Sequence, residues 1–240
     1  MIPATLHRRF YGEPGNPKYN GTLAFYSLIR RHIHRNSVVL NLGAGPPTDD
    51  KIRILKGEVA EIVGADIDPV VLTNSELDRA VVTDGRTLPL ANESFDLAFC
   101  DFVIEHVEQP AAFLAEVHRV LKPGASFFFR TPNLLHYIAL VSRATPHWFH
   151  AAVANRARDL ADDAHEPWPT FYRLNTRGTI RRLARQTGFQ RAELQMVEYE
   201  PMYLMFHTIP FLAGVAYERT VNSTELFAGL RANIFGRLVK

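Results

Sequence analysis

The chain has 240 residues, of which 47% are apolar and 22% are charged, as is usual for a soluble globular protein. Its net charge of +2 is too small to indicate a polyanionic partner, so no nucleic-acid partner is expected. The single cysteine, Cys100, excludes an internal disulfide and a cysteine-based zinc site. No other cluster of metal-ligating side chains stands out, and no metal is predicted.

The sequence predicts a cytoplasmic protein. The N-terminal segment lacks the apolar core of a signal peptide, and no apolar run approaches the roughly 18 residues that a spanning helix needs. The best candidate, residues 203–217, is too short and contains His207 and Pro210. Contact with a membrane surface stays open.

The predicted elements alternate along most of the chain. An irregular arm at 1–20 precedes a helix at 22–34, and a first buried strand at 37–42 ends in glycine. Thr48 and the two acids that follow it predict a helix start for residues 48–56. The remaining elements are predicted as strands at 60–67, 80–84, 94–103, 125–133 and 189–199, and helices at 110–124 and 175–188.

This order predicts a doubly wound α/β fold with a mostly parallel sheet, because the strands are apolar throughout and alternate with helices. We expect one domain with its core at 36–133 and 175–199, after an arm and helix at 1–35. Residues 134–174 interrupt the alternation and are rich in proline and aromatic side chains, which predicts a lid. Residues 200–240 are predicted to be amphipathic helices; monomer and homodimer both stay open.

Glycine and polar side chains follow the first four predicted strands, where open parallel sheets bind their ligands. They are Gly43, Ala44 and Gly45 after the first strand, Asp66 after the second, Asp84 after the third, and Asp101, Glu105 and His106 after the fourth. The glycines permit close approach to the backbone, and a carboxylate about twenty residues further on can bind a ribose diol. The pattern is compatible with NAD, a flavin or S-adenosylmethionine.

The residues at the start of the predicted helix at 48–56 narrow the choice of cofactor. A dinucleotide site needs helix N–H groups aimed at a pyrophosphate. Pro46 and Pro47 remove such donors, while Asp49 and Asp50 add negative charge. This composition disfavours NAD and tolerates a ligand with a cationic amino group.

Five stretches resemble the class I S-adenosylmethionine-dependent methyltransferases, in particular the methyltransferase type 11 group that includes the ubiquinone-biosynthesis O-methyltransferases. They are "VVLNLGAGP" (38–46), "IVGADIDP" (62–69), "TDGRTLPLANESFDLAFCDFVIEHV" (83–107), "FLAEVHRVLKPGASFFFRTPN" (113–133) and "LARQTGF" (183–189). The resemblance implies S-adenosylmethionine as the cofactor and S-adenosylhomocysteine as its product. The resemblance implies that Gly43, Ala44 and Gly45 hold the methionine part of the cofactor and that Asp66 binds its ribose. It also implies that the adenine contacts Ile67, Asp84, Gly85 and Arg86. Asp101 and Phe102 would lie near the sulfonium.

Two positions depart from the family pattern. Asn41 stands where the family has an acid, and Pro47 replaces the third glycine of the turn. Asn41 can still hydrogen-bond but offers no charge to the cofactor's amino group. Asp49 or Asp50 is a candidate to supply that charge.

Methyl transfer from a sulfonium is an in-line displacement that depends on alignment, and a hydroxyl acceptor must also lose a proton. His106 is the predicted general base; a matching histidine takes part in catalysis in phosphoethanolamine methyltransferases. A structural histidine bonded to the backbone is the alternative, and Glu105 is predicted to be structural. Side chains predicted to line the acceptor pocket are His136, Tyr137, His165, Trp168 and Tyr172, which suit a cyclic acceptor.

The sequence therefore predicts an S-adenosylmethionine-dependent enzyme of biosynthesis that O-methylates a small molecule, such as a sugar, a phenol or quinone, or a natural product. N- or C-methylation within the same fold is an alternative. So is a catalytically silent module that binds the cofactor or a partner, which Asn41 and Pro47 keep open. A lipid-acceptor enzyme that docks residues 203–240 on a membrane and NAD-dependent oxidation are further alternatives.

Overall fold

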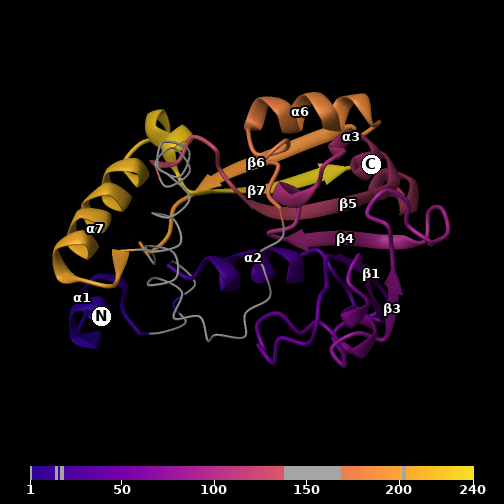
Figure 1. The fold of residues 1–240 in the computed structure, drawn as a ribbon, viewed down its shortest axis with the longest axis horizontal. Helices are drawn as coiled ribbons and strands as arrows, with labels where there is room; N and C mark the ends of the chain where they lie inside the picture. The colour runs from indigo at the N-terminus through magenta and orange to yellow at the C-terminus, as the bar shows by residue number, and fades with distance from the viewer. Residues whose placement is uncertain (1, 14–15, 17–18, 138–168, 202–203) are drawn as a thin grey trace. The chain divides into compact units, whose positions relative to one another are not determined.

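The computed structural model describes residues 2–13, 16, 19–137, 169–201 and 204–240, and these residues form two compact units (Figure 1). The sheet unit comprises Phe25–Pro132, Pro169–Gln195 and Ile234–Lys240. Of the described residues, the helical unit comprises 2–13, 16, 19–24, 133–137, 196–201 and 204–233. The expectation of one domain stays a prediction.

Seven strands form one sheet in the order β3-β2-β1-β4-β5-β7-β6. They are β1 (Val38–Leu42), β2 (Glu61–Asp66), β3 (Arg79–Val82), β4 (Phe95–Asp101), β5 (Leu121–Pro132), β6 (Arg191–Val197) and β7 (Asn233–Val239). All pairs from β3 to β5 are parallel. β7 runs antiparallel to β5, because Lys240 N donates to Ala125 O at one end and Asn133 N donates to Ala232 O at the other. The predicted doubly wound, mostly parallel fold is confirmed.

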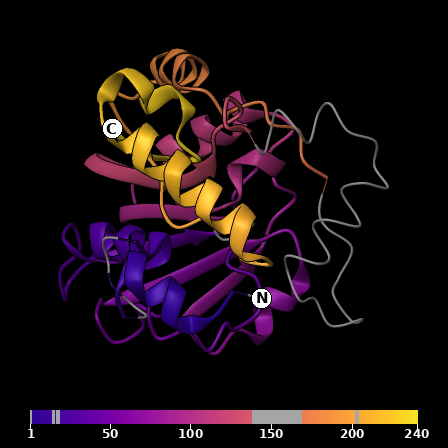
Figure 2. The same cartoon turned by 90° about the vertical axis from the view of Figure 1, so that its left-hand side faces the viewer.

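Helices cover both faces of this sheet. Phe127 of β5 contacts Phe113 of α3 (Pro110–Val120), whereas the next residue, Phe128, contacts His32, which follows α2 (Gly21–Arg30). Successive side chains of a strand point to opposite faces, so α2 and α3 lie on opposite sides. Helix α6 (Arg177–Gln186) packs against α3, and Figures 1 and 2 show it across the sheet from α2.

The helix predicted at residues 48–56 is wrong, because this segment forms turns. Asp49 has a φ of 55°, outside the right-handed helical region. The backbone N–H groups of Thr48 and Asp49 donate to Oε1 of Glu76 at 2.9 and 2.7 Å. The donors that a first helical turn would leave unpaired are thus bound by a distant side chain, and the prolines before them offer none.

The irregular arm predicted at residues 1–20 is wrong over α1 (Ala4–Tyr11), which belongs to the helical unit. α1 lies against α7 (Thr208–Asn222), as both Figure 1 and Figure 2 show. Tyr11 and Phe211 are buried there, with ring centroids 6.1 Å apart. The helix forms because this distant partner covers its apolar side chains, which composition alone does not reveal.

The prediction that residues 200–240 are helical is correct for α7 and wrong for the last strand. A short 3-10 helix, η4 (Glu225–Leu230), follows α7, and then β7 enters the sheet. Ile234, Phe235 and Leu238 of β7 are buried. A short apolar run that is buried on both faces shows no alternation, so periodicity does not distinguish it from a helix. Over the described residues, no helix is long and apolar enough to cross a membrane.

Candidate active site

The glycine turn follows β1 at the carboxyl edge of the sheet. Gly43 and Gly45 have φ angles of 69° and 55°, which favour glycine. A Cβ atom on Gly43 would overlap the side chain of Val103, which follows β4. A Cβ atom on Gly45 would meet nothing within 4 Å. A ligand can therefore approach the backbone at Gly45 without displacing protein atoms.

The Asp66 carboxylate lies beside this turn, at the end of β2. Its Oδ2 accepts from the backbone N–H of Gly45 at 2.8 Å, and its Oδ1 accepts from that of Asp68 at 2.9 Å. Because each carboxylate oxygen has a second lone pair, Asp66 can still accept from two hydroxyl groups. The geometry is suited to a ribose diol next to the open backbone of Gly45.

The loop after β3 holds Asp84, Gly85 and Arg86. Oδ1 of Asp84 accepts from the N–H groups of Thr87 and Arg86 at 2.7 and 2.8 Å, and these bonds lower the pKa of the Asp84 carboxyl. Gly85, with a φ of 74°, lies against Ile67. The loop thus places a charged acceptor next to Ile67.

Large apolar side chains, Ile67 and Phe102 among them, are exposed at this edge. Ile67 follows β2 and is 46% exposed, and Phe102 follows β4 and is 37% exposed. Phe102 has a φ of 58°, and its N–H donates to Arg130 O at 2.9 Å. The Arg130 guanidinium lies over the Phe102 ring, 4.4 Å from its centroid. The edge therefore offers apolar surface between its polar groups.

Asp101, at the end of β4, lies between two arginines. Arg130 donates to both of its oxygens, from Nε at 2.5 Å and from Nη2 at 2.7 Å. Arg53 Nη1 donates to Oδ2 at 3.0 Å. Only 6% of the Asp101 side chain is exposed. Its carboxylate is therefore already strongly bound by protein cations.

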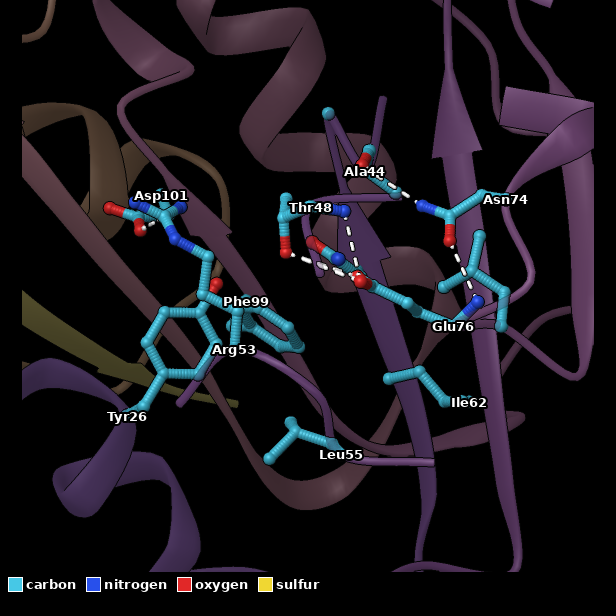
Figure 3. A pocket seen from close by; sticks show the side chains of 13 residues that line it. Tyr26, Ala44, Thr48, Arg53, Leu55, Ile62, Asn74, Glu76, Phe99 and Asp101 are labelled. Carbon is cyan, nitrogen blue, oxygen red and sulfur yellow. Dashed lines mark hydrogen bonds and ion pairs between the residues drawn. The ribbon is translucent and has the colours of Figure 1, made fainter. Parts of the chain in front are cut away.

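A pocket opens beneath the glycine turn (Figure 3). The polar residues that line it include Asn41, Thr48, Arg53, Glu76 and Asp101, and the largely apolar ones include Tyr26, Leu55, Ile62, Leu77 and Phe99. The loop at residues 46–57 contributes Thr48 and Arg53 to it. The candidates to replace the missing acid, Asp49 and Asp50, are not among the residues that line it.

His106 ends the 3-10 helix η2 (Ile104–His106) after β4. Its Nδ1 lies 2.9 Å from the carbonyl oxygen of Pro169. A carbonyl only accepts, so this contact assigns the proton of the neutral ring to Nδ1 and leaves Nε2 as an acceptor. The predicted backbone bond of a structural histidine is present, and the same bond presets the tautomer of a base.

Glu105 precedes His106 and is 4% exposed. Burial raises the pKa of its carboxyl to about 7. Oε2 accepts from the Thr131 hydroxyl at 3.0 Å, whose oxygen accepts from Asn175 Nδ2 at 2.7 Å. The Glu105 carbonyl accepts from the N–H of Tyr172 at 3.0 Å. These contacts join η2, the end of β5 and residues 171–175, which is the structural role predicted for Glu105.

The predicted acceptor residues are divided between the units. Tyr172 is exposed in the sheet unit. His136 and Tyr137 stack in the helical unit with ring centroids 4.2 Å apart, and buried His136 has Nε2 3.4 Å from Oε2 of Glu198. His165 and Trp168 lie outside the described residues. Within the described ranges, no group of three or more His, Cys, Asp or Glu side chains could hold a metal ion.

Arg53 and Glu76 are pocket residues that sequence reasoning missed. Arg53 falls in the segment expected to be a helix, and Glu76 follows η1 (Pro69–Thr73) outside any motif. The only signal for them was indirect: the proline pair and the missing acid at Asn41 indicated that this turn holds its ligand in an unusual way.

Comparison with known proteins agrees with this geometry. Residues 40–129 match the family described as "Methyltransferase domain". Ubiquinone biosynthesis O-methyltransferase of Hahella chejuensis is 34% identical over 104 residues, which are 40% of this chain and 43% of that protein. Malonyl-[acyl-carrier protein] O-methyltransferase of Methylococcus capsulatus is 29% identical over 153 residues, 60% of this chain and 55% of that protein. The chain thus spans about half the length of these curated relatives.

A solved structure supports the fold. Phosphoethanolamine N-methyltransferase 2 of Haemonchus contortus, in complex with phosphomonomethylethanolamine and S-adenosylhomocysteine, aligns with a TM-score of 0.57 at 16% identity. The alignment covers 98% of this chain and 57% of that one. Residues 40–129 of this chain thus match a methyltransferase domain, and the relatives and the solved structure named here are methyltransferases.

Proposed function

We propose that the chain is an S-adenosylmethionine-dependent methyltransferase that O-methylates a small molecule. The site fits this cofactor through the open backbone at Gly45, the Asp66 carboxylate beside it, and the exposed side chains of Ile67 and Phe102. When bound, the cofactor supplies an electrophilic methyl group. Asp66 accepts from the ribose hydroxyls, and Ile67 packs against the adenine.

The resemblance to the methyltransferase family implies further roles at this edge. Asp84 accepts from the adenine amino group, with Gly85 and Arg86 beside it. Phe102 forms an apolar floor near the sulfonium, which keeps water away from the reacting centre. Asp101 acts through its arginines, since both of its oxygens are already bound.

The His106 tautomer is the observation that carries the preference for a hydroxyl acceptor. With Nδ1–H donating to Pro169 O, Nε2 can accept a proton, and a hydroxyl acceptor needs such a base. Two of the relatives named above are O-methyltransferases, which supports the same preference. N- or C-methylation is the alternative within this fold.

The acceptor is proposed to be cyclic, a sugar, a phenol or quinone, or a natural product. Support comes from the exposed aromatic side chain of Tyr172. His136, Tyr137, His165 and Trp168 stay candidates from the sequence. We expect the reaction to take place in the cytoplasm, with the chain working as a monomer or a homodimer.

Calorimetric titration with S-adenosylhomocysteine and with NAD tests the cofactor. We expect micromolar affinity for S-adenosylhomocysteine, none for NAD, and a loss of at least roughly tenfold in Asp66→Ala, which removes a charge-assisted contact. Asp96→Ala is the matched control, because Asp96 also accepts a backbone N–H, from Val38 at 2.8 Å. It lies at the amino end of β4, away from the site, and should bind normally. Absence of binding to the unsubstituted chain would contradict the proposal.

A further inference from the structure

We propose that the pocket beneath the glycine turn is a carboxylate-binding subsite, in which Arg53 binds the carboxylate at the amino-acid end of the cofactor. The inference rests on the proposed function and assigns a recognition residue to the same site. It reverses the contact expected from the family pattern, in which an acid at the position of Asn41 faces the cofactor's amino group.

The position of Arg53 is the first observation. Its guanidinium lines the pocket together with Asn41 and lies 5.9 Å from the ring centroid of Tyr26 (Figure 3). A guanidinium carries five N–H donors in a planar fork that matches a carboxylate. Asp101 takes one of them and the Tyr26 hydroxyl another, so further N–H groups remain for a ligand. About a third of the side chain is exposed, so a ligand can reach it.

The balance of charge at this end of the pocket is the second observation. Asp101 receives three hydrogen bonds from Arg53 and Arg130, so two cations face one carboxylate. Asn41 is neutral, and its side-chain amide makes no hydrogen bond to another residue in the part of the chain that the structure describes. An ammonium group here would compete with two arginines for Asp101, whereas a carboxylate would meet the remaining N–H groups of Arg53.

The loop explains how an arginine comes to lie there. A glycine turn that leads into a helix binds anions through the free N–H groups of the first helical turn. In this chain the prolines remove donors, and Glu76 binds the N–H groups of Thr48 and Asp49. Without the helix, the chain turns at Asp50, whose carbonyl accepts from Arg53 N at 2.8 Å. The guanidinium thus replaces the missing backbone donors.

Two acids near Arg53 do not cancel its charge. Asp50 lies 3.5 Å from Nε, but 38% of its side chain is exposed, and water screens such a pair. Glu76 is held by the loop backbone and lines another part of the same pocket. A pocket that carries both signs suits an α-amino acid group, which is itself zwitterionic.

Three nucleosides test the subsite by calorimetry: S-adenosylhomocysteine, its decarboxylated analogue S-adenosyl-3-thiopropylamine, and 5′-methylthioadenosine, which lacks both charges. We expect the unsubstituted chain to bind S-adenosylhomocysteine roughly 10- to 100-fold more tightly than the decarboxylated analogue, as for one charge-assisted contact. In Arg53→Gln this ratio should fall to about 1, while the affinity for 5′-methylthioadenosine stays unchanged. Arg53→Lys should retain an intermediate ratio, because it keeps the charge and loses the fork.

Arg79→Gln is the matched control, since Arg79 also pairs with a carboxylate, Glu61 at 3.0 Å, and does not line the pocket. It should keep the full ratio. An unchanged ratio in Arg53→Gln would overturn the inference and leave the proposed function standing. If the unsubstituted chain binds none of the three nucleosides, the proposed function fails and the subsite fails with it. Thermal unfolding of each variant checks that it is folded.

Discussion

At the scale of single residues, the two ring nitrogens of His106 have different roles, one structural and one chemical. Its Nδ1 donates to Pro169 O, and its Nε2 is the proposed proton acceptor. An asparagine amide can take the place of Nδ1 but offers no base at the position of Nε2. In His106→Asn we therefore expect normal folding and cofactor binding, with turnover of a hydroxyl acceptor reduced about 10²- to 10⁴-fold.

The measurement is methyl transfer to the best acceptor from a screen of sugars and phenols, with S-adenosylhomocysteine titrations alongside. His106→Gln, which breaks the geometry at Nδ1, is the comparison. If His106 were only structural, the asparagine variant would retain activity and the glutamine variant would lose stability.

Glu105 makes stability depend on pH. Burial raises the pKa of its carboxyl from 4.5 to about 7, so between these values the native state holds a proton that the unfolded chain releases. The unfolding free energy should therefore fall as pH rises from 4.5 to 7, by on the order of 3 kcal/mol from this group. Glu105→Gln should remove that decline and be more stable than the unsubstituted chain above pH 7.

Urea titrations at several pH values measure this difference. Glutamine can still accept from Thr131, so the buried bond is kept while the titration is removed. Since every other titratable group is the same in both proteins, the difference between their curves isolates Glu105. Parallel curves for the two proteins would show that its pKa is not raised.

At the scale of elements, α6 carries a row of like charges that destabilises the helix. Arg177, Arg181 and Arg185 are exposed at successive i,i+4 positions, and no acid occurs between residues 177 and 190. Like charges at this spacing each cost about 0.2–0.5 kcal/mol. Arg181→Glu converts two repulsions into two attractions, and we expect the unfolding free energy to rise by about 1 kcal/mol.

Urea denaturation at low salt measures the gain, and the same experiment in 1 M NaCl should remove most of it, because surface pairs are screened. A gain that persists in high salt would have a cause other than the charges on this helix.

The strands of the core could be predicted from the sequence because their signal is local. Phe127, Phe128 and Phe129 are all fully buried, and an apolar run of this kind shows in the sequence as a strand covered on both faces. The segment at 48–56 could not, since its conformation depends on Glu76, which binds the backbone N–H groups of Thr48 and Asp49. A helix start signal is ambiguous when a distant side chain satisfies the same donors.

The residues of the candidate site also differ in whether the sequence could predict them. Asp66 could be predicted because a strand end and a spacing of about twenty residues define it, and its carboxylate does lie beside Gly45. Arg53 could not, because it belongs to the pocket only once the expected helix is absent. Assignments that depend on strand order were predictable, and those that depend on one loop conformation were not.

At the scale of the whole molecule, each unit is assembled from segments far apart in the chain. In the helical unit, α1 packs against α7, about two hundred residues away, through Tyr11 and Phe211. In the sheet unit, β7 lies between β5 and β6, both earlier in the chain. Neither partner is visible from local periodicity, which is why α1 and β7 were both missed.

This late strand makes the last residues essential to the sheet unit. Lys240 N donates to Ala125 O, Gln190 N donates to Val239 O, and Ile234 and Leu238 are fully buried. Deletion of residues 233–240 would leave unpaired strand edges and an open core. We expect the deleted chain to lose cooperative unfolding in urea and to aggregate; a cooperative transition at an unchanged midpoint would contradict the place of β7 in the sheet.

The addition of a single methyl group tests the same packing without the deletion of any residue. A Cβ atom on Gly236 of β7 would overlap the Phe129 ring of β5, so Gly236→Ala must displace the ring or the strand, at about 1–3 kcal/mol. Gly178 in α6 has open space at its Cβ position and no positive φ, so Gly178→Ala should instead stabilise the protein by about 0.5–1 kcal/mol. The same chemical change thus has opposite signs in the two elements. Urea denaturation of both variants measures it, and equal effects would mean that β7 does not pack on Phe129.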